Sequence, residues 1–362
     1  MKFRKILSLA LAASALSAVM LTSCGNETKD PSEADGDKVY NIGICQLVTH
    51  DALDAATEGF KQALIDKLGR DHVKFDEQNA ANSSDVCGTI INSFVSSNVD
   101  LILANATPAL QTAANATKTI PILGTSVTEY GVALSIDNFN GTVGENISGT
   151  SDLAPLEDQA QMILDLVPSA KTVGLLYCSA EQNSEYQVKV VKEYLDNKGI
   201  KTEVYSFSGS EDVALVTETA SSECDALYIP TDNTAASCSQ TIGNIIRPKK
   251  IPAIVGEVGI CRGCGIATLS ISYEKIGYTT GEMAAKILTG EAKIEEMPIA
   301  YDDSPVKLYN PEICEEYGIT PPDGYAPMDA EEEPEDATDT SDTAADTVDT
   351  ADTADTTADT AA

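Results

Sequence analysis

Residues 99–124 read VDLILANATPALQTAANATKTIPILG, and this stretch decides the fold class. An apolar run at 101–104 is followed by a polar loop, a helical stretch and a second apolar run at 120–124. Thr107 is placed to cap the helix, and Pro108 suits its first turn. The stretch therefore predicts a strand, a helix and a second strand.

The same alternation continues along most of the chain. Apolar or β-branched runs predict strands over 39–45, 73–75, 101–104, 120–124, 172–177, 202–207, 226–229, 251–255 and 266–270. Amphipathic stretches predict helices over 52–68, 84–96, 184–198 and 274–288. Strands that alternate with helices are typical of parallel sheets covered on both faces. We therefore expect an α/β protein with two Rossmann-like, doubly wound lobes.

The helix pattern pauses near 131–146, and we place the boundary between the lobes there. Lobe 1 is expected at 39–135 plus about 273–292, and lobe 2 at 136–272 plus about 293–325. The helix at 274–288 is expected to return to lobe 1. Ligands of such sheets bind beyond the carboxyl ends of the strands, so the loops at that edge are the candidate site.

The amino-terminal end predicts export. Residues 1–23 combine Lys2, Arg4 and Lys5 with an apolar run, as signal peptides do. The sequence LTSC at 21–24 resembles the bacterial lipobox, which implies lipidation of Cys24 and an extracytoplasmic protein held at the cell membrane. An ordinary signal peptide with a chance cysteine is the alternative. Residues 24–38 are polar and are expected to form a flexible tether.

The chain is strongly acidic, with 57 Asp and Glu against 23 Lys and Arg and a net charge of −34. This charge disfavours a nucleic-acid partner, whose phosphates it would repel. Residues 329–362 contain 13 acidic residues and no basic one, in a quasi-repeat of Asp, Thr and Ala. This tail is expected to be disordered because it offers almost nothing to bury.

The cysteines suggest no metal site. CRGC at 261–264 is the one close pair, and it has neither a second CxxC nor a nearby histidine to complete a zinc site. We expect a local disulfide or two unremarkable thiols there. An exported thiol oxidoreductase is a minor alternative.

Polar loops follow the predicted strands of both lobes, at 46–51, 78–83, 105–108, 125–130, 178–184 and 230–234. They carry neutral hydrogen-bonding groups and a few carboxylates, which suits a zwitterion: the helix start at Thr107 for a carboxylate, and Asp232 or Glu129 for an ammonium. A plain helix cap at Thr107 is the alternative. GxSxG, P-loop, HExxH and GxGxxG patterns are absent from the sequence, so we expect neither catalysis nor a cofactor.

Several motifs carry a family resemblance: QNAANSS at 78–84, NATPA at 105–109, EQNSEYQ at 181–187, PTDN at 230–233 and SISYEKIGYTTGEMAAKIL at 270–288. Over about 39–320 the chain resembles the substrate-binding lipoproteins of ABC importers, in the group that includes tryptophan- and aromatic-amino-acid-binding proteins. The resemblance implies a type I periplasmic-binding-protein fold, whose lobes are joined by three crossovers, here near 125–150, 269–274 and 291–305.

The resemblance also implies a set of ligand-binding residues: Thr107, Pro108, Asn183, Ser184, Asp232 and Asn233, with Gln78 and Tyr273 as walls. The loop 127–130 departs from the family pattern, and Glu129 or Tyr130 is expected to reshape the pocket there. It implies a monomer that captures an amino-acid-like solute, with aromatic ones among the candidates, and delivers it to an ABC permease. An extracellular sensor subunit and a sugar- or nucleoside-binding protein are the alternatives.

Overall fold

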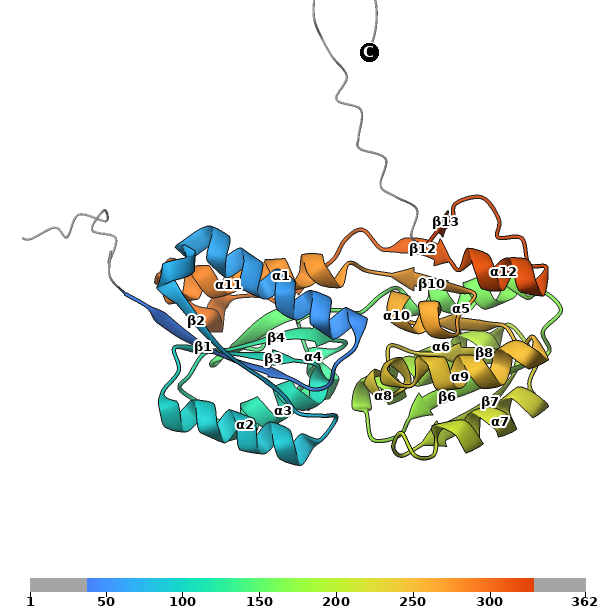
Figure 1. The fold of residues 1–362 in the computed structure, drawn as a ribbon, viewed down its shortest axis with the longest axis horizontal. Coiled ribbons are helices and arrows are strands. Elements are labelled where there is room, and N and C mark those ends of the chain that lie inside the picture. The colour runs from blue at the N-terminus through green and yellow to red at the C-terminus, as the bar shows by residue number, and fades with distance from the viewer. Residues whose placement is uncertain (1–37, 329–362) are drawn as a thin grey trace, which may run out of the picture.

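Two sheets, one in each lobe, organise the computed structural model, which describes residues 38–328 (Figure 1). The predicted lipidation site at Cys24 and the acidic tail lie outside the described residues, as does almost all of the predicted tether. The α/β class and the two doubly wound lobes expected from the sequence are confirmed.

The sheet of lobe 1 has the order β11-β5-β4-β3-β1-β2, and all of its neighbouring strands are parallel. Its strands are β1 (Tyr40–Gln46), β2 (Val73–Asn79), β3 (Leu101–Asn105), β4 (Ile122–Val127), β5 (Ile147–Ser151) and β11 (Ala300–Tyr301). The helices α1 (Asp51–Leu68) and α11 (Tyr273–Leu288) cover one face. The other face carries α2 (Ser84–Ser97), α3 (Thr107–Ala116) and the short α4 (Tyr130–Ala133).

The sheet of lobe 2 has the order β13-β12-β10-β9-β8-β6-β7, and only β12 runs antiparallel to its neighbour β10. Its strands are β6 (Thr172–Cys178), β7 (Lys201–Phe207), β8 (Ala226–Ile229), β9 (Ala253–Val255), β10 (Ala267–Ser270), β12 (Val306–Tyr309) and β13 (Ala326–Pro327). One face packs on α5 (Leu156–Leu166), α6 (Gln182–Asn197) and α12 (Pro311–Tyr317). The other packs on α7 (Val213–Glu223), α8 (Asn233–Ser237), α9 (Ser239–Ile246) and α10 (Val258–Gly263).

Helix α11 returns to lobe 1 and packs on α1, as expected. Glycines let the two backbones approach closely: a Cβ on Gly277 would lie 2.1 Å from the carbonyl oxygen of Ala56, and one on Gly59 would lie 2.3 Å from that of Glu274. Larger side chains at these positions would push the helices apart.

The predicted boundary at 135/136 is wrong, because β5 pairs with β4 and β11 pairs with β5. Sheet 1 therefore extends to Ser151, and residues 293–301 belong to lobe 1. The chain crosses between the sheets after β5, after β10 and after β11. The second and third crossovers lie where the sequence placed them, and the first follows the predicted 125–150 directly.

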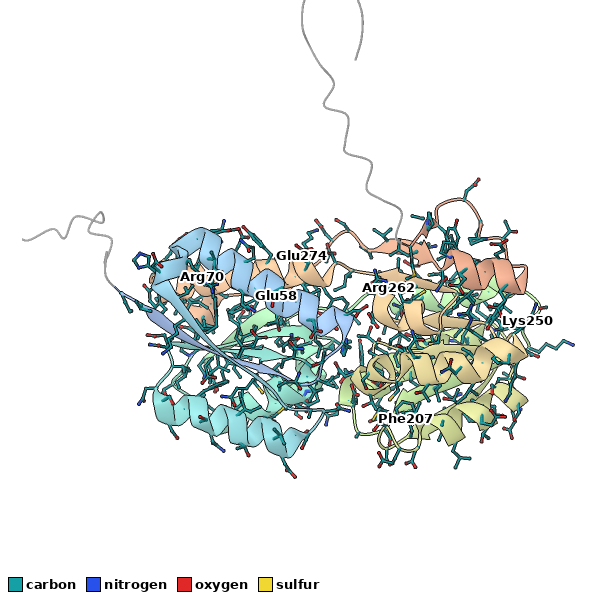
Figure 2. All side chains as sticks on the ribbon, viewed as in Figure 1. Glu58, Arg70, Phe207, Lys250, Arg262 and Glu274 are labelled. Atoms are coloured by element: carbon teal, nitrogen blue, oxygen red, sulfur yellow. The ribbon has the colours of Figure 1, made fainter. Side chains whose placement is uncertain are left out.

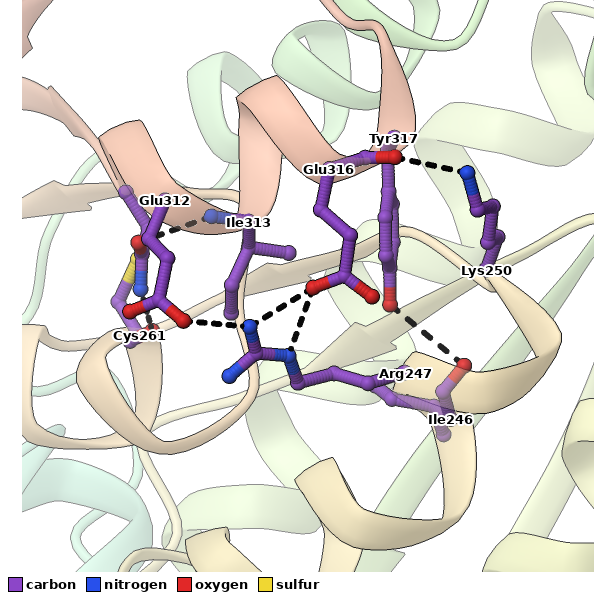
Figure 3. A network of polar contacts seen from close by, with 9 residues as sticks. Ile246, Arg247, Lys250, Cys261, Glu312, Ile313, Glu316 and Tyr317 are labelled. Atoms are coloured by element: carbon purple, nitrogen blue, oxygen red, sulfur yellow. Dashed lines mark hydrogen bonds and ion pairs between the residues drawn. The ribbon is translucent and has the colours of Figure 1, made fainter.

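Helix α12 is fastened to lobe 2 by the network in Figure 3. Arg247 reaches Glu312 and Glu316, each with a nitrogen–oxygen distance of 2.7 Å, and Lys250 donates to the carbonyl oxygen of Glu316 at 2.8 Å. Ile313 and Cys314 fill the core beneath the helix. These contacts attach α12 to the sheet of lobe 2, whose strands carry the site loops.

Candidate functional site

The carboxyl ends of the two sheets face each other, and the loops there touch across the gap. Asn82 of lobe 1 donates to Thr234 of lobe 2 at 3.0 Å, and His50 Nε2 lies 3.3 Å from Asn233 Oδ1. Gln111–Gln182 and Asp51–Arg262 contacts lie nearer the rim, and Figure 2 shows Arg262 at the seam between the lobes. The lobes are therefore closed on each other.

Buried polar atoms without a partner mark the inside of this junction. Of the ten such atoms in the described chain, five lie on or just after different strands: His50 Nδ1 after β1, Thr107 Oγ1 after β3, Ser126 Oγ on β4, Asp152 Oδ1 after β5, and Asn183 Oδ1 after β6. Buried polar groups in proteins are normally hydrogen-bonded, so unpaired ones need an explanation. A polar ligand held between the lobes would supply the missing partners.

The start of α3 combines free donors with local backbone strain. Thr107 is 3% exposed, and its hydroxyl has no partner. Ser126, on the adjacent strand, also has an unpaired hydroxyl. The backbone φ is 92° at Ala106 and 54° at Ser126, in a region that non-glycine residues seldom adopt. Together with the first-turn N–H groups of α3, the two hydroxyls can hold a carboxylate.

The start of α8 is already capped by two carboxylates of lobe 2. Glu181 accepts hydrogen bonds from the backbone and side chain of Asn233, at 3.0 and 2.6 Å, and from those of Thr234, at 2.9 and 2.8 Å. Asp232 accepts from the N–H of Ala235 and of Cys178, each at 2.7 Å. Both acids hold the loop that presents Asn233 to lobe 1.

Asp232 therefore has little left to offer a ligand ammonium, the role that the sequence suggested. It is 1% exposed, and both carboxylate oxygens are engaged within lobe 2. Burial, together with the nearby charge of Glu181, raises the pKa of Asp232 well above its usual range. Asn233 faces lobe 1 directly. Asn183 and Ser184 lie in the first turn of α6, where Asn183 also donates to the carbonyl oxygen of Thr231 at 3.2 Å.

Asp152 and Tyr273 meet beside the crossovers. The Tyr273 hydroxyl donates to Asp152 Oδ2 at 3.0 Å, and both residues are buried. Burial raises the pKa of Asp152 to about 6, and hydrogen bonds from Thr128 and Tyr273 partly oppose this shift. Glu257 adds a second carboxylate nearby, and burial raises its pKa as well. The site thus has two buried carboxyl groups on the side next to the crossovers.

Two other predicted residues have local partners. Gln78 lies on the edge strand β2 and donates to Asp76 at 3.0 Å on an exposed surface. Glu129 caps α4 by accepting from the N–H of Val132. The next residue, Tyr130, is buried in lobe 1 and donates to the carbonyl oxygen of Thr150 at 3.0 Å.

The cysteines of the CRGC motif are buried free thiols on and just after α10. Burial raises the pKa of both Cys261 and Cys264. A redox-active cysteine needs the thiolate, which a raised pKa suppresses. No metal-ligand group of three or more His, Cys, Asp or Glu is assembled within 38–328. Nor does this range contain a helix long and apolar enough to cross a membrane.

Surface cavities flank the junction. One of about 580 Å³ lies mainly on lobe 1 beside α3 and α4 and reaches Gln182 of lobe 2. Two others of about 220 Å³ open between the lobes, one under Glu181 and Thr234 and one beside Glu257 and Tyr273. None of the three is lined by Thr107 or Asp152.

Sequence reasoning missed several of these groups. Asp152 follows β5, a strand that was not predicted, and Ser126 and Glu181 were read only as parts of the polar loops 125–130 and 178–184.

Comparisons with known proteins agree with this architecture. A family model described as ABC transporter substrate binding protein matches residues 41–328. The chain is 36% identical over 319 residues to a tyrosine-binding protein of Clostridioides difficile, covering 85% of this chain and 91% of that protein.

Two solved structures are also similar. One is an ABC domain in complex with L-Trp from Streptococcus pneumonia, at 30% identity and a TM-score of 0.75, covering 79% of this chain and 97% of that one. The other is a ligand-free, open substrate-binding protein with adhesive properties from Clostridium difficile, at 37% identity and a TM-score of 0.62, covering 80% and 99%. The architecture is the type I periplasmic-binding-protein fold that the resemblance implied.

Proposed function

This chain belongs to the ABC transporter substrate-binding protein family, and on that premise we propose that it captures an amino acid, aromatic ones first, between its lobes and delivers it to an ABC permease. The observation that carries the proposal is a group of buried, unpaired polar atoms at strand ends of both lobes: His50 Nδ1, Thr107 Oγ1, Ser126 Oγ and Asp152 Oδ1 in lobe 1, and Asn183 Oδ1 in lobe 2. An amino acid supplies a carboxylate, an ammonium and a side chain in one small molecule, which suits a site of this mixed character.

The carboxylate end is assigned to the start of α3. Thr107 and Ser126 provide unpaired hydroxyls there, and Pro108 fits the first turn because the N–H that it lacks would have no partner within the helix. Asn183, Ser184 and Asn233 close over the ligand from lobe 2. Contacts from both lobes favour the closed state over the open one, so binding and closure are one equilibrium. The relatives that bind tyrosine and L-Trp support an aromatic side chain.

Titration calorimetry of the purified mature protein against the twenty amino acids, D-glucose and adenosine tests this function. We expect heat from L-tyrosine or L-tryptophan and none from the sugar or the nucleoside. Absence of heat with every amino acid would overturn the proposal, and heat with only the sugar or the nucleoside would replace it.

In the cell, we propose that the protein is a monomer on the extracytoplasmic face of the membrane, attached through a lipid on Cys24. A Cys24→Ala variant is expected to leave the membrane fraction and to lose labelling by a fatty-acid probe, because it lacks the thiol that would carry the lipid anchor. Equal membrane retention of the variant would contradict the anchor without touching the binding function.

A further inference from the structure

Four acidic residues in the described chain are less than 5% exposed: Asp152, Glu181, Asp232 and Glu257. No lysine or arginine among the described residues is buried to that extent. Buried carboxylates are costly unless hydrogen bonds or opposite charges compensate them. How each of the four is compensated therefore shows which one lacks a partner.

Three of the four have helix-start donors. Glu181 and Asp232 accept from the backbone N–H groups that open α8, and Glu257 accepts from Gly259 and Ile260 at the start of α10. Such donors stabilise the charged form of a carboxylate. These three acids therefore have a structural role within lobe 2.

Asp152 is the exception. It is 4% exposed, its Oδ2 accepts from the Tyr273 hydroxyl, and the side chain of Thr128 also stabilises its charged form, yet its Oδ1 has no hydrogen-bond partner among the described residues. No helix start supplies donors to it. It lies directly after β5, at the carboxyl edge of sheet 1, and Glu257 adds negative charge nearby. A buried carboxylate oxygen without a donor is stabilised by a cationic group that binds next to it.

We infer that Asp152 Oδ1 receives the ammonium group of the bound amino acid, so that Asp152, and not Asp232, selects amino acids over their deaminated analogues. This inference rests on the proposed function and adds the residue that reads the amine. It gives the two ends of the ligand separate partners, because the carboxylate is assigned to α3 and the amine to the loop after β5.

The test compares L-tyrosine with 3-(4-hydroxyphenyl)propionate, which lacks the amine, by calorimetry on the mature protein. Asp152→Asn keeps the shape of the side chain and can still accept from Tyr273. We expect it to lower the affinity for L-tyrosine at least tenfold, and to leave the affinity for the propionate unchanged or higher. Asp165→Asn, which removes an exposed charge on α5, is the matched control and should change neither.

The affinities of the unmodified protein for the two ligands, measured at several pH values, test the same assignment without a substitution. Between pH 7.5 and 5.5, L-tyrosine should bind more weakly as Asp152 is protonated, whereas the propionate should bind more tightly. The same trend for both ligands, or full L-tyrosine affinity in Asp152→Asn, would overturn the inference while leaving the proposed function intact. If the unmodified protein bound no amino acid, the proposed function itself would fail.

Discussion

The hydroxyl of Tyr273 donates to Asp152 across 3.0 Å and joins two crossovers of the chain, because Asp152 follows β5 and Tyr273 opens α11. Crossovers are the segments that must bend when the lobes open and close. This one bond therefore links the place where the lobes pivot to the carboxylate that we assign to the ligand amine.

Replacing Tyr273 with Phe should affect both stability and binding. The variant removes one of two hydroxyl donors to Asp152, and a hydrogen bond to a charged group contributes about 1.5–3 kcal/mol. We expect the free energy of unfolding to fall by about that amount, and the pKa of Asp152 to rise further. Urea unfolding and the pH at which L-tyrosine affinity halves would both shift. Unchanged values for both would show that the bond is incidental.

Stability of the ligand-free protein should increase as pH falls from 7.5 to 5. The pKa of Asp152 is raised to about 6 from an ordinary value of 3.8, so the folded state holds a proton that the unfolded state releases. That stabilisation is complete below about pH 3.8 and is lost as pH rises through about 6. A shift of this size corresponds to on the order of 3 kcal/mol.

The groups that face Asp152 are Tyr273, Thr128, Tyr130 and Glu257. Glu257 and Asp232 have raised pKa values too, so they add to the same trend. Subtracting the pH profile of Asp152→Asn isolates the contribution of this one residue. Parallel profiles for the two proteins would contradict the assignment.

Thr107→Val should lower the affinity only for ligands that carry a free carboxylate. Valine keeps the shape of threonine and removes a buried hydroxyl that has no partner, so the ligand-free protein should be no less stable. L-tyrosine affinity is expected to fall about tenfold, or about 1.4 kcal/mol, and tyrosinamide affinity should change little. Thr112→Val, on the same helix but bonded to the carbonyl oxygen of Pro108, is the control. Equal losses for both ligands would indicate a packing effect.

The fold was largely predictable because apolar periodicity marks buried strands and helices, and nine strands of the two sheets carry that pattern. The pattern failed at β5, whose residues ISGTS are buried although only one is apolar. The reason is tertiary: Tyr130 lies over Gly124 and Gly149, where a Cβ would come within 2.5 and 2.4 Å of its hydroxyl. A strand of small residues accommodates that ring.

The site was predictable only as a region. Parallel strands place their following loops at one edge, so the loops could be named from sequence. Which atoms in them remain unpaired depends on partners far along the chain. Asp232 looked available in PTDN, but its two oxygens are used by Cys178 and Ala235, whereas Asp152 had no motif to distinguish it.

The contact between α1 and α11 should be sensitive to one added methyl group. Gly277→Ala would place a Cβ 2.1 Å from the carbonyl oxygen of Ala56, so the helices must separate, and we expect a loss of about 1–3 kcal/mol in unfolding free energy. Gly88→Ala on α2 is the matched control, since its nearest neighbour would be 4.0 Å away. It should be neutral or stabilise by up to about 1 kcal/mol. We expect Gly277→Ala to melt at a lower temperature than Gly88→Ala, and the reverse order would contradict the close contact between α1 and α11.

Glu181→Gln should loosen the loop that lobe 2 presents to lobe 1. The glutamate is 4% exposed and accepts hydrogen bonds from Asn233 and Thr234, so an amide nitrogen in place of one oxygen would face donors. Mispairing of this kind costs about 1–3 kcal/mol. Because Asn233 contacts His50 and Thr234 contacts Asn82, part of that cost should appear as weaker closure and lower ligand affinity.

Glu185→Gln is the control for this change, because Glu185 lies exposed in the first turn of α6, the helix that directly follows Glu181. X-ray scattering with and without L-tyrosine would measure closure directly, as a smaller radius of gyration on binding. The Glu181→Gln protein should need more ligand to reach the compact form, whereas Glu185→Gln should follow the unmodified protein. A variant that lost stability but closed at the same ligand concentration would show that Glu181 supports the fold of lobe 2 without tuning the junction.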